Sequence, residues 1–279
     1  MTNSPFISET NPVRLHEGKA PESGYFQKFS NIDDTYMQVR TQEAGNRYEL
    51  NICFLNGRIA RETAHKQTVA GSYIFHTFNP AFNRLRGLHK LVLTERNSVN
   101  AQRTWESAPI CIAREYETLP LIQYRHSKNN EIRYADFDYF SLRVEGGFEM
   151  HNEQPKMINT VYMNGNLQYN MLHSHRYFTR IFHAGGTFGT NWDITNTIHR
   201  AFGCDTVFID GVGYVQYEGA EWTANQIDHY APRTWTTELV PTRARLTREA
   251  NLIEDDLLKT TGFWRPTDYW WDDTFWRTH

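Results

Sequence analysis

The sequence predicts an all-β fold, mainly antiparallel and arranged as a sandwich or barrel built from hairpins. Three turn dipeptides, Asn56-Gly57, Asn164-Gly165 and Asp210-Gly211, each lie between runs of alternating apolar and polar residues, which is the strongest short-range hairpin signal in a sequence. Because Asn, Asp and Gly adopt positive φ angles at low cost, we expect a two-residue turn at each dipeptide. No helix of crossover length separates the strands, which also favours antiparallel over parallel sheets.

Short strand-like runs occupy most of the chain. They are rich in β-branched and aromatic residues, which fit a pleated, half-buried surface. The runs expected as strands are 36–40, 48–55, 69–78, 88–94, 110–116, 121–126 and 132–144. In the later hairpins we expect 158–163 to face 166–172, and 206–209 to face 212–217.

Two helices are expected among the strands. Asp193 would cap a short helix and Gly203 would end it, because these residue types favour helix starts and stops. The longer C-terminal helix is expected from Thr242 to Lys259. The apolar face of the first helix would carry Ile194, Ile198, Ala201 and Phe202, and that of the second Leu246, Ala250, Ile253 and Leu257.

The sequence divides into three segments. Residues 1–24 are polar and punctuated by proline, so we expect an extended N-terminal arm that becomes ordered only where something holds it. Residues 25–240 are expected to form the β-sandwich or barrel body. Residues 241–279 would supply the C-terminal helix and an aromatic tail.

The tail is unusual because chain ends are normally polar. Half of the chain's eight tryptophans lie after Gly262. Exposing so much aromatic surface to water would create an adhesive patch, so we expect the tail to be buried against the body or against a neighbouring subunit. The residues expected at this interface are Trp264, Tyr269, Trp270, Trp271, Phe275 and Trp276.

Composition argues against several classes of partner. The formal net charge is −3 and the pI is near 6.5, so no broad basic surface is available to neutralise nucleic acid or an anionic membrane. No run approaches the ~18 apolar residues of a membrane span. The first twelve residues lack the apolar core of a signal peptide. We expect a soluble protein made in the cytoplasm without a signal peptide, and a place in a larger particle fits this expectation.

One pattern suggests a metal site. His173 and His175 are two residues apart, so on a strand their side chains would point to the same face and could chelate a transition metal. His183 has the same parity and is the expected third ligand. Cupin barrels use such a His-x-His pair, but no Glu follows this pair at their usual short interval. The alternative is that all three are strand histidines hydrogen-bonded to neighbours.

A pair of carboxylates suggests a second site. Asp136 and Asp138 would share a face of one strand, roughly 6 to 7 Å apart. Such a pair could bind calcium, or it could serve as glycosidase carboxylates, whose separation overlaps this distance. The alternative is a polar strand face. The sequence contains no nucleophile elbow, phosphate-binding loop, zinc-protease helix or dinucleotide-binding motif.

The sequence therefore predicts a non-enzymatic structural subunit of a multi-subunit assembly, such as a bacteriophage capsid, neck or tail component. Its expected partners are other copies of itself or other protein subunits, and no cofactor is expected. The alternative is a β-barrel enzyme or small-ligand binder, cupin-like or calycin-like in architecture, with a histidine-lined pocket that holds a transition metal. A third reading, carbohydrate binding by the tryptophan-rich tail, ranks below both.

Overall fold

The computed structural model describes residues 4–20, 25–42, 45–96, 102–128, 130–163, 169–186, 189–217, 220–226 and 233–245. Within these ranges it describes the backbone alone for residues 149–152, 158–163, 169–175, 225–226 and 243–245. Strands dominate the described residues and nearly all strand pairs are antiparallel, which confirms the predicted all-β fold class. The helical elements in this part of the chain are α1 (Trp192–Phe202) and the short 3₁₀ helix η1 (Arg114–Thr118).

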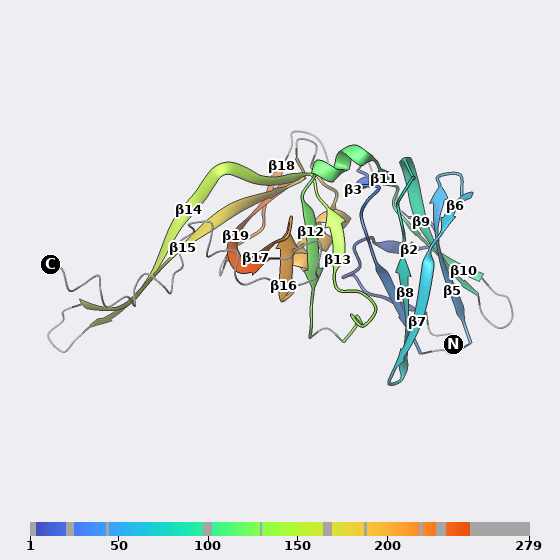
Figure 1. The fold of residues 1–279 in the computed structure, drawn as a ribbon, viewed down its shortest axis with the longest axis horizontal. Helices are drawn as coiled ribbons and strands as arrows, with labels where there is room; N and C mark the ends of the chain where they lie inside the picture. The colour runs from blue at the N-terminus through green and yellow to red at the C-terminus, as the bar shows by residue number, and fades with distance from the viewer. Residues whose placement is uncertain are drawn as a thin grey trace.

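Two sheets form a sandwich in the first half of the chain, the N-terminal lobe (Figure 1). The first sheet has the spatial order β1 (Phe6–Ile7), β4 (Met37–Thr41), β8 (Tyr73–Asn79) and β7 (Ala64–Ala70). The second has the order β2 (Leu15–Glu17), β10 (Gln102–Ser107), β9 (Gly87–Arg96), β11 (Ile110–Ile112) and β3 (Gln27–Phe29), with β5 (Arg47–Phe54) also paired to β9 and β6 (Ile59–Glu62) paired to β5. Residues of both sheets share one core, in which Val39 and Phe78 pack with Leu50 and Leu91.

A third sheet forms the C-terminal lobe. Its spatial order is β13 (Phe140–Arg143), β12 (Leu121–Arg125), β16 (Thr206–Ile209), β17 (Val212–Gln216), β19 (Arg233–Arg245), β15 (Tyr169–Ala184) and β14 (Gly146–Met163), with β18 (Thr223–Gln226) paired to β19. Helix α1 packs on this sheet, and its Ile198 and Phe202 share a second core with Ile122 and Phe182. The segment expected as one body, 25–240, thus carries two hydrophobic cores.

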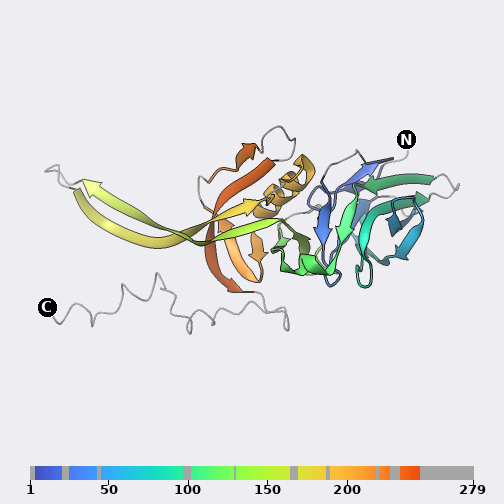
Figure 2. The ribbon, with the colours of Figure 1, turned by 90° about the horizontal axis from the view of Figure 1, so that it is seen from above.

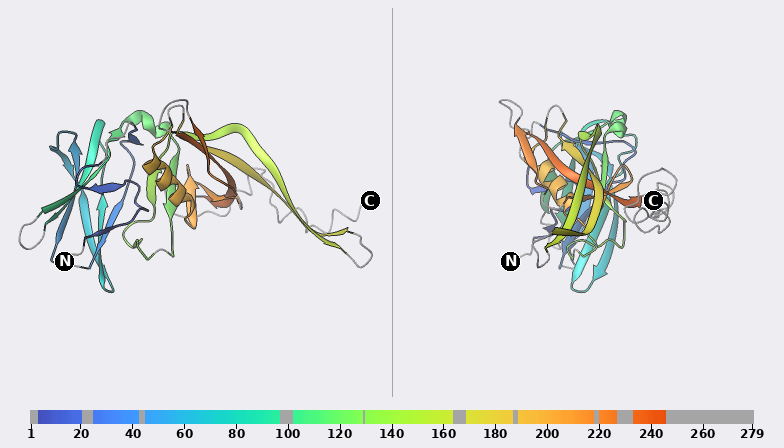
Figure 3. Two further views of the ribbon diagram at one scale, coloured as in Figure 1. Left: turned by 180° about the vertical axis from the view of Figure 1, so that it is seen from behind. Right: turned by 90° about the vertical axis from the view of Figure 1, so that its left-hand side faces the viewer.

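The molecule is elongated. Figures 2 and 3 show the two lobes side by side along the long axis, and the β14–β15 hairpin extends beyond the C-terminal lobe. Strand β14 pairs with β15 over almost their whole length, whereas β15 pairs with β19 only from Arg180 to Ala184. Most of the hairpin is therefore a two-stranded ribbon.

Alternation of side chains explains the burial of the strands. In β5, Tyr48, Leu50 and Ile52 are buried. The alternate residues Arg47 and Glu49 are exposed. A shift of one residue in the register of β5 would move all three apolar side chains out of the core. The hydrophobic pattern therefore fixes the pairing of β5 with β9.

Two of the three predicted turns are described. Asp210 and Gly211 have φ angles of 50° and 78° and connect the paired Ile209 and Val212, as a two-residue type I′ turn requires. At the first turn, the amide of Gly57 donates to the carbonyl of Phe54 and only Gly57 has a positive φ, 85°. This connection is a three-residue loop with a bulge, so the two-residue turn predicted there is wrong.

The hairpin predicted at Asn164-Gly165 is present in its strands, but its turn lies outside the described residues. Met163 pairs with Tyr169, so five residues connect the strands. The predicted two-residue connection would pair Met163 with Asn166, so the predicted register of this hairpin is wrong.

The first predicted helix is confirmed as α1, with a different cap. The side chain of Asn191, rather than Asp193, accepts a hydrogen bond from the amide of Ile194 at 3.0 Å. Such a bond satisfies one of the free amides at a helix start. Asp193 instead lies in the first turn, where its charge suits the helix dipole.

The longer helix was expected to begin at Thr242. Strand β19 instead continues through Arg245, with Arg245 paired to Val212 and Pro241 paired to Tyr214, so the helix prediction is wrong for its first four residues. The remainder, 246–259, lies outside the described residues.

The expected N-terminal arm contributes two strands to the N-terminal lobe. Strand β1 pairs with β4, and β2 pairs with β10. Between them, buried Asn11 donates to the carbonyl of Gln38 at 2.9 Å and accepts from its amide at 2.7 Å. The described part of the arm, residues 4–20, is thus held by the sheets.

Gly146, at the start of β14, provides a test of the hairpin geometry. Its φ is 120°, and an added Cβ would collide with the backbone carbonyl oxygen of His183 on β15. We expect Gly146→Ala to lower the free energy of unfolding by at least about 3 kcal/mol, because positive φ alone costs roughly 1–2 kcal/mol. Gly57→Ala, at a φ of 85° with open space around it, should cost only about 1 kcal/mol. Equal losses in urea unfolding would contradict this geometry.

A buried histidine lies in the N-terminal lobe. His76 on β8 is 2% exposed, its Nδ1 is 3.0 Å from His65 Nε2, and its ring packs on Tyr48. Burial, followed by the charge of His65, lowers the pKa of His76 to about 4. His76 Nε2 has no hydrogen-bond partner among the described residues, so none of them would accept a hydrogen bond from this nitrogen if the ring were protonated.

His76 should therefore make the protein sensitive to acid. Its pKa falls from 6.5 to about 4 on folding, so the unfolded chain binds the proton more tightly and stability is lost as the pH falls through that range. We expect His76→Gln to reduce the loss of unfolding free energy between about pH 7 and pH 4 by about 3 kcal/mol. Urea unfolding at both pH values measures it, and parallel losses in the two proteins would contradict the assignment.

Candidate functional site

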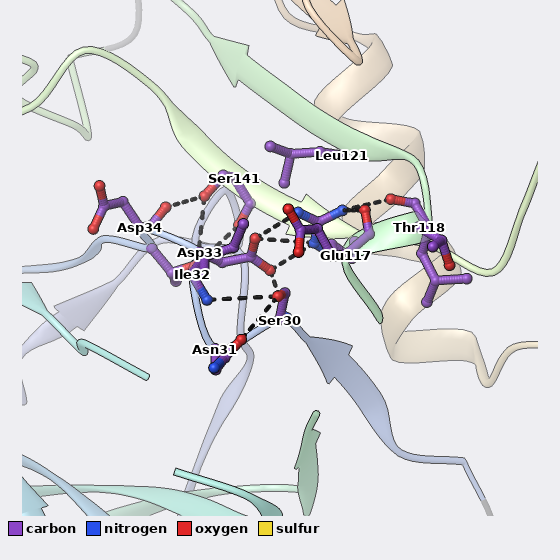
Figure 4. Close-up of polar contacts among 12 residues, drawn as sticks. Ser30, Asn31, Ile32, Asp33, Asp34, Glu117, Thr118, Leu121 and Ser141 are labelled. Carbon is purple, nitrogen blue, oxygen red and sulfur yellow. Dashed lines mark hydrogen bonds and ion pairs between the residues drawn. The ribbon is translucent and has the colours of Figure 1, made fainter. Parts of the chain in front are cut away.

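The junction between the lobes contains a buried ion pair. Arg143 at the end of β13 and Asp33 after β3 are 3% and 2% exposed. Arg143 Nε and Nη2 donate to the Asp33 carboxylate at 2.7 to 2.9 Å, and Nη1 donates to the carbonyls of Glu117 and Leu119. Figure 4 shows this cluster, in which Asp33 also accepts from the amide of Ser30. All three guanidinium nitrogens thus donate to partners within the protein, which indicates a structural role.

Other polar contacts extend this junction. Gln38 on β4 donates through Nε2 to the carbonyl of Arg133 and accepts from the Arg133 amide at 2.7 Å. The hydroxyl of Tyr124 on β12 donates to the carbonyl of Thr10 at 2.7 Å. The lobes are thus joined by directional hydrogen bonds, whose geometry fixes their relative orientation.

The predicted pair of carboxylates does not share one face of a strand. Asp136 and Asp138 lie in the irregular segment before β13, not on a strand, and Asp138 is exposed whereas the Asp136 side chain is buried. Burial raises the pKa of Asp136, but hydrogen bonds from Lys66 and Thr68 outweigh it and hold the pKa below its usual range. Asp136 therefore anchors the C-terminal lobe to β7 as a carboxylate, and the expectation of a shared strand face is wrong.

The structure does not bring the three predicted metal ligands together. Strand β15 is continuous, and it places His173 opposite Thr160 and His183 opposite Gly147. His175 and His183 are eight residues apart, roughly 26 Å at about 3.3 Å per residue, whereas ligands of one zinc ion lie about 2 Å from the metal. The side chains of His173 and His175 lie outside the described part of the structure. Among described residues, no three metal-binding side chains cluster.

A polar cleft of about 700 Å³ lies between α1 and the loop after β12. Burial, followed by the charge of Asp205, raises the pKa of the Cys204 thiol to about 12, so the thiol stays protonated and is a poor nucleophile. Arg200 is held in an ion pair with Glu9. The cleft therefore offers no activated cysteine. Its lining residues are Thr10, His126, Lys128, Asn130, Glu131, Asn196, His199, Arg200, Gly203, Cys204 and Gln216.

The β14–β15 hairpin is the feature best suited to binding a partner. At its base, one face is fixed to the body: Lys156 Nζ lies 2.9 Å from Glu238 Oε1, Thr179 donates to the same oxygen, and Tyr177 packs on Tyr217. The base is therefore rigidly attached to the C-terminal lobe.

The opposite side of the base carries apolar side chains in water. Met157 and Phe178 are 52% and 42% exposed, and Pro155, also exposed, pairs directly with Phe178. We call these three residues the outer face of the hairpin. Adjacent exposed apolar side chains on one projecting element are typical of an interaction surface.

The rest of the hairpin lacks charge. From Met157 to His175 the sequence contains no Asp, Glu, Lys or Arg in 19 residues, although charged residues make up 22% of the chain. Exposed edge strands in soluble proteins are usually protected by charges, above all Lys. Sequence reasoning singled out this segment for its histidines; the uncharged run was the signal that pointed to an interaction surface instead.

The predicted interface residues of the tail, Trp264, Tyr269, Trp270, Trp271, Phe275 and Trp276, lie outside the described residues. No helix in the described part of the chain has the length and apolar character needed to cross a membrane. Comparison with protein-family models, curated proteins and solved structures finds no match to this chain.

The buried ion pair at the junction should contribute strongly to the free energy of unfolding. We expect Arg143→Met to cost about 3–5 kcal/mol of unfolding free energy, because it leaves the Asp33 charge buried without its partner. Arg14→Met is the control, since Arg14 pairs with Asp193 at the surface, where Arg14 is 40% exposed, and its loss should cost at most about 1 kcal/mol. Urea denaturation compares them, and a small loss at Arg143 would contradict the structural role.

Proposed function

We propose that this chain is a non-enzymatic structural subunit of a multi-subunit assembly, and that the β14–β15 hairpin docks onto a neighbouring subunit. The observation that carries the proposal is the hairpin itself, a projecting two-stranded ribbon whose distal 19 residues are uncharged. The assembly we favour is a virion, with this chain in the capsid, neck or tail. In such a particle many neighbouring copies would hold each extended segment.

The physics of β-structure supports a partner. An isolated two-stranded hairpin is marginally stable in water, and further strands or a packed surface are needed to stabilise it. Beyond the pairing of Arg180 with Leu239, the described residues supply the hairpin with no further strand. A neighbouring subunit would cover this ribbon and remove its apolar area from water at about 25 cal/mol per Å².

The alternative, a metal-dependent barrel enzyme, has less support. Its expected ligand trio is spread along β15, with His175 and His183 eight residues apart. The thiol in the cleft, that of Cys204, has a raised pKa, and the buried carboxylate of Asp136 is engaged by Thr68 and Lys66. These groups serve packing and lobe attachment rather than the activated chemistry of a catalytic site.

Shortening the hairpin tests the proposal. In the variant, residues 154–179 are replaced by Asn-Gly, which closes the paired Glu153 and Arg180 with a two-residue turn and removes both the exposed apolar residues of the base and the uncharged run. The pairing of β15 with β19 from Arg180 to Ala184 remains, so the body should stay folded, which far-UV circular dichroism and the unfolding midpoint verify. By light scattering and sedimentation we expect the full-length chain to form oligomers and the shortened chain to be monomeric.

Two results would contradict the assembly proposal. If the full-length chain stays monomeric over a wide range of concentrations, and its hairpin amides are nevertheless protected from exchange, then the hairpin needs no neighbour and the assembly proposal is wrong. If both chains form the same oligomers, the hairpin is not the docking element.

A further inference from the structure

A second exposed apolar surface lies on the N-terminal lobe. Where β5 turns into β6, Phe54 at the end of β5, Leu55 in the loop and Ile59 at the start of β6 are 42%, 50% and 51% exposed. We call these three residues the tip surface. Single exposed apolar residues are common on proteins, but three large ones at one turn form a patch that is typical of a binding site.

The tip surface adjoins an open sheet edge. Strand β6 pairs with β5, and no other described strand pairs with it. An edge strand presents free amide and carbonyl groups that can accept another chain. The side of the sheet next to Ile59 is therefore open to a partner.

The tip surface lies on the N-terminal lobe, whereas the outer face lies at the base of the hairpin, beside the C-terminal lobe. Figures 1 and 3 show β6 at one end and the β14–β15 hairpin at the other. A single contact of this kind between two copies joins them head to tail, which generates a closed ring or an open filament. Two such contacts between the same two copies would instead close a two-fold symmetric dimer.

The charges around the two surfaces match. The outer face is flanked by exposed Glu153 on β14 and by exposed Arg176, which pairs with Met157 four residues further along β14. The tip surface is flanked by exposed Arg58 and, four residues along, by exposed Glu62. On each surface one acid and one base are thus separated by four residues, about 13 Å of extended chain. When β14 and β6 approach in parallel, Glu153 meets Arg58 and Arg176 meets Glu62, whereas an antiparallel approach would bring like charges together.

We propose that the tip surface of one copy of this chain is the docking site for the outer face of the hairpin of a second copy, so that copies join head to tail. This inference rests on the proposed function and names its partner. Apolar contact of the outer face with Leu55 and Ile59 would supply most of the affinity, and the flanking charges would fix the register.

Three variants test the proposal. Met157→Asp with Phe178→Asp disables the hairpin face, and Leu55→Asp with Ile59→Asp disables the tip surface. All four side chains are more than 40% exposed, so the monomer should stay folded, which circular dichroism and urea unfolding verify. Val69→Asp is the control, since Val69 is exposed on β7 in the other sheet of the N-terminal lobe.

Light scattering of the purified chains, alone and mixed, gives the decisive result. Each disabled variant alone should be monomeric, because every copy lacks one of the two surfaces. An equimolar mixture of the two should form dimers and nothing larger, because one intact hairpin face and one intact tip surface remain to combine. The wild type and Val69→Asp should form larger oligomers.

Each other outcome overturns a stated part of the account. If the wild type is oligomeric and the tip variant is oligomeric too, the docking site is wrong while the assembly role of the hairpin stands. If both variants are monomeric and their mixture stays monomeric, the contact is symmetric rather than head to tail. If the wild type itself is monomeric, the proposed function fails with it.

The charge pairing is tested separately. Arg58→Glu or Glu153→Arg alone should weaken self-association by about two- to fivefold, as expected for exposed ion pairs. The double variant, which restores opposite charges across the contact, should recover most of the loss. Additive weakening in the double variant would contradict the contact between these two residues.

Discussion

The buried ion pair of Arg143 and Asp33 is the interaction on which the arrangement of the two lobes depends. Both charges are removed from water, and such a pair is tolerated only where geometry and further hydrogen bonds compensate for the lost hydration. Here the carbonyls of Glu117 and Leu119 accept further hydrogen bonds from Nη1 of the guanidinium. Because Arg143 ends β13 three residues before Gly146 begins β14, the same pair also sets the direction in which the hairpin leaves the body.

Charge is distributed in an unusual way between the junction and the hairpin. The junction buries charged side chains, each with a partner, and Asp136 is held below its usual pKa by the hydrogen bonds it accepts. The hairpin exposes apolar side chains at Met157 and Phe178 and carries no charge beyond them as far as His175. A free monomer gains nothing from this arrangement, because exposed apolar side chains and unprotected strand edges promote association. It is what a subunit needs if the rigid junction presents the hairpin to a neighbour.

Local rules predicted the fold class, most of the strands and the turn at Asp210-Gly211, because alternation and turn chemistry act over a few residues. Some expected strands are wrong in extent: the run 69–78 contains the turn between β7 and β8, and only 140–143 of the run 132–144 is a strand. An Asn-Gly dipeptide suits both a two-residue turn and a three-residue loop, so the residues Asn56-Gly57 alone could not predict which connection forms. The site was harder to predict. The even-numbered spacing placed His183 on the same strand face as His173 and His175. Only the structure showed that the strand is continuous between them, which puts His183 far from the other two. The role of Asp136 depends on hydrogen bonds from β7 and β8, which are distant from it in the sequence, so it could not be predicted locally. The uncharged run 157–175, in contrast, can be read directly from the sequence.

The claim that the hairpin is covered by a neighbour is tested most directly by hydrogen–deuterium exchange of its backbone amides. Peptides covering 157–163 and 169–175 should exchange rapidly in dilute, monomeric protein, because a two-stranded ribbon opens readily. At concentrations where the chain assembles, the same peptides should become protected, while those from the buried strand β5 should be protected throughout. Unchanged exchange of the hairpin amides between dilute and assembled protein would contradict the account.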